Sequence, residues 1–212
     1  MDIKAGIKKL FGGSARCCEA DELLAGVRRA YSAAATDPGR THPFPVGKAF
    51  AQGVGYSPSL LDSLPAEAVD SFAGVGPVAG FAEIEPGARV LDIGCGAGLD
   101  SLLAARKSGV GGRVVGLDFS HAMLTQAMVA ARRAGEGTIL YCCGDAGHLP
   151  LATASVDVVL ANGIFNLNPE RQGLFREMAR VLRPGGRAFA AELVFTQPQS
   201  AQGVRDINDW LS

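Results

Sequence analysis

The sequence predicts an α/β protein with a doubly wound, mostly parallel sheet and a helical N-terminal segment. The 212 residues are 48% hydrophobic and 19% charged, which is a globular composition with enough chain to bury a core. From residue 88 on, short apolar runs alternate with amphipathic stretches, which is typical of a parallel sheet with helices on both faces. Seven of the 11 prolines precede that point and divide the earlier part into short segments.

We therefore divide the chain into a helical N-terminal segment, residues 1–87, and an α/β domain, residues 88–212. In the first part, apolar residues at helical spacing predict a helix over 19–31. Ser57 followed by a proline is typical of a helix start, and a helix is expected from there to about residue 64. One or two further helical turns are expected over 66–72.

In the α/β domain, apolar runs bounded by glycine, proline or capping residues predict the strands and helices in order. Five strands are expected at 89–93, 113–118, 138–142, 156–161 and 187–195. Helices are expected at 99–107, 120–134 and 169–182, with a further one from about Val204. Gly109 and Gly135 follow the first two helices, and Pro184 with two glycines stops the third.

Composition excludes several classes of function. The formal net charge of −1 gives no basic excess for nucleic acid, so a small-molecule partner is expected. No apolar run approaches a membrane span, and no signal peptide is visible at the start. The five cysteines are odd in number and include two adjacent pairs, which does not suit a secreted disulfide framework. We expect a cytoplasmic protein.

The most informative segment joins the first strand to the first helix and reads Val90-Leu91-Asp92-Ile93-Gly94-Cys95-Gly96-Ala97-Gly98. Glycines allow a tight turn and a close approach of ligand to backbone, and the following helix presents free N–H groups. A nicotinamide-type fingerprint requires a further glycine where this chain has Leu99. Asp92 would also repel a pyrophosphate, whereas it would attract a cationic amino group.

Acidic residues follow the second and third strands as well. Asp118 ends the second strand, where a carboxylate can accept hydrogen bonds from both hydroxyls of a ribose. Gly144 and Asp145 follow the third strand, where the carboxylate is placed to accept from an adenine amino group and the N–H of Ala146 to bind the ring. We therefore expect one pocket that holds an amine, a ribose and an adenine in that order.

Together these motifs resemble those of class I S-adenosylmethionine (SAM)-dependent methyltransferases, over about residues 85–195. Residues 92–98 are similar to the family's first motif, and residues 182–186 to the turn before its fifth strand. The resemblance implies a Rossmann-like fold, SAM as cofactor, Phe119 stacked on the adenine and Asn162 near the methyl donor. The expected cofactor-binding residues are Asp92, Gly94, Cys95, Gly96, Gly98, Asp118, Phe119, Gly144, Asp145, Ala146 and Asn162, and no metal site is expected.

Over about residues 50–212 the chain also resembles the arsenite methyltransferase branch of that class, through residues 55–58 and 161–169. Members of that branch bind trivalent arsenic through cysteine thiolates. This chain has Val75 and Gly163 at two of the matching positions, and the third lies beyond Ser212. Because As(III) is a soft ion that requires thiolates, we expect another small-molecule acceptor. Arsenite methylation through the other cysteines is the alternative.

Residues 1–87 are expected to fold over the donor, with His42 and Tyr56 as candidate catalytic groups on the substrate side. Class I sheets usually continue with two more strands, which this chain is expected to lack. The strand at 187–195 would then be an open edge, which a homodimer or a partner chain would cover. A SAM-binding protein without catalysis and a nucleotide-linked oxidoreductase are the alternatives to a small-molecule methyltransferase.

Overall fold

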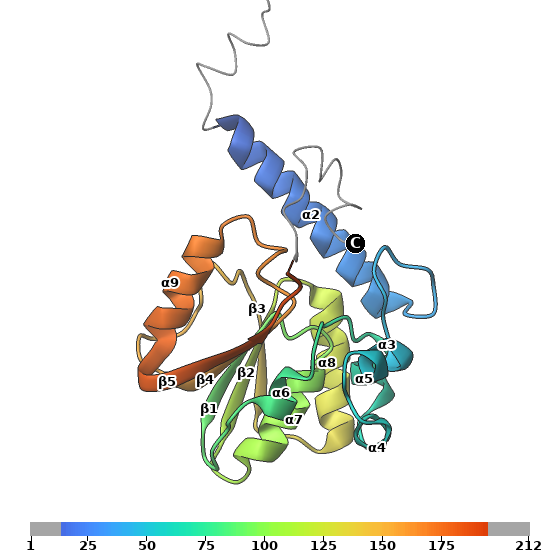
Figure 1. Cartoon of the computed structure of the whole chain (residues 1–212), viewed down its shortest axis with the longest axis vertical. Coiled ribbons are helices and arrows are strands. Elements are labelled where there is room, and N and C mark those ends of the chain that lie inside the picture. The colour runs from blue at the N-terminus through green and yellow to red at the C-terminus, as the bar shows by residue number, and fades with distance from the viewer. Residues whose placement is uncertain (1–13, 195–212) are drawn as a thin grey trace, which may run out of the picture.

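The computed structural model describes residues 14–194, with side chains from residue 22 on. Its centre is a sheet of five strands in the order β3-β2-β1-β4-β5, and every pairing is parallel (Figure 1). The strands are β1 (Arg89–Ile93), β2 (Arg113–Asp118), β3 (Ile139–Cys143), β4 (Val156–Asn162) and β5 (Leu182–Ala191). The strand order reverses beside β1, which is the switch point of a doubly wound sheet. The predicted fold class is confirmed.

Helices cover both faces of this sheet. The helices α6 (Val78–Phe81), α7 (Leu99–Ser108) and α8 (His121–Ala134) pack on one face, and α9 (Arg171–Val181) packs on the other. Alternate residues of β1 therefore enter different cores. Val90 packs beneath α7 and α8, whereas Leu91 packs against Leu174 of α9. Figure 1 shows α9 on its own side of the sheet.

The N-terminal part of the described chain is helical, as expected. Its helices are α2 (Ser14–Thr36), α3 (Lys48–Gly53), α4 (Pro58–Asp62) and α5 (Ala66–Asp70). The N-cap of α4 is Ser57, whose Oγ accepts a hydrogen bond from the N–H of Leu60 at 3.3 Å, as the sequence predicts. The C-terminal half of α2 packs on α8, where Val27 and Ala34 share a core with Met123.

The start of β5 differs from the sequence prediction. The strand begins at Leu182, which pairs with Val156, and the next paired residues are Val158 and Arg187. Residues 183–186 thus form a bulge inside the strand instead of a turn before it, with Gly185 in the left-handed region at φ 80°. Such a bulge accommodates extra residues without ending the strand.

The connection between β3 and β4, residues 144–155, contains no helix. It is an extended loop that α9 supports from the side. No helix in the described part of the chain combines the length and apolar character that crossing a bilayer requires. The expected end of the last strand at Phe195, the helix from Val204 and the side chains of Cys17 and Cys18 lie outside the described residues.

Candidate active site

A cavity of about 80 Å³ lies at the carboxyl ends of β1, β2 and β4. In doubly wound sheets this edge, at the switch point, is where ligands bind. Seven of the 11 predicted cofactor residues line the cavity, namely Asp92, Gly94, Cys95, Gly96, Asp118, Phe119 and Asn162. The other four, Gly98, Gly144, Asp145 and Ala146, lie outside its lining.

The glycines after β1 shape the floor of the cavity. Gly94, Gly96 and Gly98 all have positive φ, at 68°, 53° and 87°, a region that side chains disfavour. Gly98 is also the N-cap of α7, and a Cβ there would lie 2.5 Å from the hydroxyl oxygen of Tyr141. Gly98 therefore serves the turn and its packing without lining the cavity.

Three buried carboxylates face the cavity. Asp92, Asp100 and Asp118 are only 2%, 5% and 5% exposed, and no Lys, Arg or His among the described residues lines the space between them. Burial raises the pKa of Asp92 well above its usual range, and the nearby charge of Asp100 adds to the shift. Burial also raises the pKa of Asp118, to about 6. An enclosed site of this kind favours a cationic ligand.

The Asp118 carboxylate is fixed by the backbone around it. Its Oδ2 accepts from the N–H of Gly96 at 2.9 Å, and its Oδ1 accepts from the N–H of Ser120 at 2.8 Å. Each oxygen retains acceptor capacity for a ligand hydroxyl. Beside it, the guanidinium of Arg28 from α2 lies 5.5 Å from the centre of the Phe119 ring.

Asp100 was not predicted as a site residue. Its Oδ1 accepts from the hydroxyl of Tyr56 at 2.8 Å and from the N–H of Ala79 at 3.0 Å, and its Oδ2 accepts from Nδ2 of Asn162 at 2.8 Å. The only sequence signal is an acidic residue in the first turn of α7. Its partners come from distant segments, so the sequence does not reveal them.

Asn162 uses its whole amide to hold the chain at residues 75–76. Its Oδ1 accepts from the N–H groups of Val75 at 2.7 Å and Gly76 at 3.2 Å. Its Nδ2 donates to the carbonyl of Gly76 at 2.7 Å in addition to Asp100. Because an amide has two donor hydrogens and two acceptor positions, Asn162 is saturated within the protein.

The two candidate catalytic groups lie apart from the cavity. Tyr56 is buried and its hydroxyl contacts Asp100 and the carbonyl of Gly76, and burial raises the pKa of this phenol above its usual range. His42 lies in an outer groove, where its Nε2 is 2.8 Å from the carbonyl oxygen of Asp37. The structure does not bring His42 to the three carboxylates.

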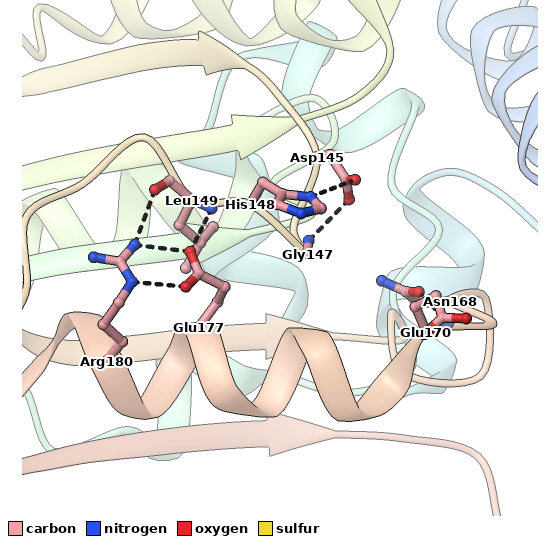
Figure 2. Close-up of polar contacts among 8 residues, drawn as sticks. All are labelled: Asp145, Gly147, His148, Leu149, Asn168, Glu170, Glu177 and Arg180. Carbon is pink, nitrogen blue, oxygen red and sulfur yellow. Dashed lines mark hydrogen bonds and ion pairs between the residues drawn. The ribbon is translucent and has the colours of Figure 1, made fainter.

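The predicted adenine loop lies next to Asp118. The N–H of Gly144 donates to the carbonyl of Asp118 at 3.0 Å. Asp145 is exposed, and its Oδ1 accepts from the N–H of Gly147 at 2.8 Å (Figure 2). Its Oδ2 also lies 3.4 Å from Nδ1 of His148, and the side chain remains exposed enough for a ligand that extends beyond Asp118 to reach it.

Several apolar or aromatic residues that line the cavity were not predicted from the sequence. Tyr31 of α2 lines the cavity and stacks on Phe44, with ring centres 4.4 Å apart. Ile164 and Leu167, from the loop after β4, line it as well. Ile164 packs so closely on the glycine turn that a Cβ on Gly94 would clash with its Cγ2. These residues match no motif, because apolar side chains of this kind also form ordinary cores.

The two positions that match arsenic-binding cysteines of the arsenite branch lie side by side. A Cβ on Gly163 would be 3.4 Å from Cγ1 of Val75. Neither residue has a thiol, and Cys142 and Cys143 lie instead at the end of β3. Within the described part of the chain, no three His, Cys, Asp or Glu residues gather to hold a metal ion.

Residues 84–210 match a family model described as a methyltransferase domain. An arsenite methyltransferase from Halobacterium salinarum is 39% identical over 145 residues, which cover 68% of this chain and 37% of that protein. Nocamycin O-methyltransferase from Saccharothrix syringae is 37% identical over 102 residues, which cover 48% of this chain and 36% of that protein.

A solved structure of an arsenic(III) S-adenosylmethionine methyltransferase from Chlamydomonas reinhardtii aligns with a TM-score of 0.59 at 31% identity. The alignment covers 63% of this chain and 47% of that one. This chain thus spans less than half the length of these three relatives.

The matched region contains all five strands and the glycine turn. The buried carboxylates of the cavity suit SAM, because this cofactor brings a sulfonium and an ammonium group. The family match, the relatives and the fold agree with the resemblance seen in the sequence. The chain belongs to the class I SAM-dependent methyltransferases.

Proposed function

We propose that this chain transfers a methyl group from SAM to a small-molecule acceptor. The observation that carries the proposal is the cavity with three buried carboxylates, no lining cation among the described residues and a glycine turn at its floor. When bound, SAM would supply an electrophilic methyl group: an acceptor nucleophile bonds to the methyl carbon as the carbon–sulfur bond breaks, and S-adenosylhomocysteine leaves. Such a displacement mainly requires alignment of the two reactants and exclusion of water.

We assign the donor contacts residue by residue. Asp92 faces the ammonium group, Asp118 accepts from the ribose hydroxyls, and Phe119 stacks on the adenine. Asp145 and the N–H of Ala146 bind the adenine edge. The open acceptor positions of Asp118 and the exposed carboxylate of Asp145 support these roles.

The N-terminal segment serves as a lid over the donor. Tyr31 lines the cavity, Arg28 lies over Phe119, and the hydroxyls of Ser32 and Ser120 are 2.8 Å apart. A cavity of about 80 Å³ is smaller than the several hundred Å³ of a typical cofactor site. Donor entry therefore requires α2 or the Ile164 loop to shift outward.

On the acceptor side, we propose a substrate other than thiolate-bound arsenite. Val75 and Gly163 form a small thiol-free surface next to Asn162, and this surface suits an organic acceptor. Asn162 would act by holding this wall of the site. His42 and Tyr56 remain predictions for substrate-side groups. His42 would need to approach from its outer groove, and Tyr56 would act through Asp100.

Two further expectations concern assembly and location. β5 pairs only with β4 in the described residues, and exposed Leu193 and Val194 follow it, so we propose a homodimer through this edge. Light scattering of the purified chain tests this assembly. The odd number of cysteines and their two adjacent pairs in the sequence support a reducing, cytoplasmic location. The near-neutral net charge supports a partner that is not a nucleic acid.

Calorimetric titration with SAM, with NAD as the control ligand, tests the donor site. We expect SAM to bind and NAD not to bind. Asp92→Ala and Asp118→Ala should each weaken SAM binding by about 1–3 kcal/mol, the scale of charged hydrogen bonds. Asp62→Ala, which changes an exposed acid on α4, is the matched control. Unchanged affinity in both cavity variants would refute the assignment.

Release of S-adenosylhomocysteine in the presence of candidate acceptors then tests catalysis. Acceptors with nucleophilic carbon, nitrogen, oxygen or sulfur should be compared, with arsenite included. Methyl transfer to arsenite alone would contradict the proposed acceptor class. SAM binding without transfer to any acceptor would favour a non-catalytic SAM-binding protein.

A further inference from the structure

The loop after β3 is anchored at two points on either side of a short exposed turn. At one end, the N–H of Gly144 donates to the carbonyl of Asp118 at 3.0 Å. At the other, Leu149 is buried in the core that contains Leu91. Between these anchors, the N–H of His148 donates to the carbonyl of Asp145 at 3.0 Å and closes the turn. The anchors thus determine where the proposed adenine-binding groups lie.

The second anchor includes two charged residues of α9, as Figure 2 shows. Oε2 of Glu177 accepts from the N–H of Leu149 at 2.8 Å. Arg180 donates from Nη2 to the carbonyl of Leu149 at 3.0 Å and from Nη1 to the carbonyl of Leu151 at 2.7 Å. Arg180 also donates to the Glu177 carboxylate, from Nε to Oε1 at 2.6 Å and from Nη2 to Oε2 at 2.7 Å.

This pair differs from an ordinary surface ion pair. An exposed pair three residues apart on a helix contributes little, because water competes for both charges. The side chains of Glu177 and Arg180 are 19% and 32% exposed, and three of their hydrogen bonds reach the backbone of another segment. Charge-assisted bonds of this kind are short and strong. The hydrogen bond from Arg180 also lowers the pKa of Glu177 to about 2, so the carboxylate stays ionised.

We propose that Glu177 and Arg180 are positioning residues for the methyl donor. They hold residues 145–149 in the arrangement that places Asp145 and the N–H of Ala146 against the adenine ring, without touching the donor themselves. A backbone that is ordered in advance loses less conformational entropy on binding. The inference rests on the proposed adenine-binding role of this loop.

The test compares four single variants. Glu177→Gln removes the charge and one acceptor, and Arg180→Lys keeps the charge but cannot reach two carbonyls and a carboxylate at once. Glu83→Gln and Arg187→Lys are the matched controls, because those residues form an exposed ion pair outside the cavity lining. Each variant is titrated with SAM and with 5′-methylthioadenosine, which has the adenine and ribose but no amino acid part.

We expect Glu177→Gln and Arg180→Lys to raise the Kd of both ligands by a similar factor, about tenfold. Hydrogen exchange of the peptide covering 145–151 should become faster in the ligand-free variants. A purely structural role would lower the melting temperature without changing Kd below it. The control variants should leave Kd and the exchange of this peptide unchanged.

Unchanged Kd in both α9 variants, with or without faster exchange, would overturn the proposal. If the wild-type chain binds neither ligand, the donor site itself fails, and the positioning role fails with it. Asp145→Ala distinguishes the contribution of the loop backbone from that of the Asp145 carboxylate. If that variant keeps full affinity while the α9 variants lose it, the pair acts through the backbone of the loop, and the inference stands without the Asp145 contact.

Discussion

Asp118 provides a test in which stability and ligand binding respond to pH in opposite directions. Burial raises the pKa of its carboxyl from 3.8 to about 6, so the folded state holds this proton more tightly than the unfolded chain. The stability that this group contributes is fully present below pH 3.8 and is lost as the pH rises through 6. Between pH 5 and pH 8, the loss is about 1.4 kcal/mol.

Donor binding should follow the opposite trend. Ribose hydroxyls donate to the ionised carboxylate, and at pH 5 only about a tenth of the folded molecules have Asp118 ionised. The affinity should therefore rise about tenfold between pH 5 and pH 8, because the proton must leave before the ligand binds.

Urea unfolding and calorimetric titration at several pH values measure the two effects. S-adenosylhomocysteine serves as the probe, since it has the same ribose as SAM. Asp118→Asn has no titrating group and keeps one acceptor for the backbone N–H groups. The difference between wild type and variant thus isolates Asp118 from the other buried acids. Equal pH slopes for wild type and variant in either measurement would refute the reasoning.

Three other variants test separate parts of the site. Ile164→Ala removes the side chain that packs on the glycine turn. It should lower the Kd for SAM severalfold in calorimetry. Weaker binding would show that Ile164 contacts the donor instead. Tyr56→Phe should cost about 1–2 kcal/mol in urea unfolding, because Asp100 loses a donor, and should leave SAM affinity within about twofold; a large loss of affinity would place Tyr56 at the ligand. Gly98→Ala should lower the free energy of unfolding by at least about 1–2 kcal/mol, because φ is 87° and the hydroxyl of Tyr141 occupies the space of a Cβ. Gly137→Ala is the control, because a Cβ there meets nothing nearby. Unchanged stability of Gly98→Ala would contradict the prediction.

The regular part of the fold could be predicted from the sequence because its signals are local. Apolar strands between glycines, and Ser120 and Gly135 at the two ends of α8, indicate their elements directly. The helices α3 and α6 are six and four residues long, too short to show a helical period. The bulge in β5 could not be predicted, because it depends on which residues of β4 lie opposite.

The site residues likewise fall into those that could be predicted from local motifs and those that could not. The glycine turn and the acids at strand ends form motifs within a few residues, so they are visible in the sequence. The hydrogen bonds of Asp100 join residues up to 62 positions apart, and its role depends on the orientation of the Asn162 amide. Tyr31 and Ile164 enter the cavity only because of how α2 and one loop pack. Long-range packing of this kind has no local sequence signal.

The three buried carboxylates differ in how far the protein already satisfies them. Asp100 accepts from Tyr56, Ala79 and Asn162, and Asp118 accepts from two backbone N–H groups. Asp92 accepts a side-chain hydrogen bond only from the hydroxyl of Ser101, at 2.6 Å, among the described residues. The need for a positive charge is therefore greatest at Asp92.

A ligand charge should thus matter most at Asp92. Asp92→Asn should weaken SAM by about 1.5–3 kcal/mol, the scale of a hydrogen bond to a charged group. The same variant should change the Kd of uncharged 5′-methylthioadenosine by no more than about twofold, since that ligand has no ammonium group to lose. Equal losses for both ligands would mean that Asp92 shapes the pocket as a whole and that the ammonium group binds elsewhere.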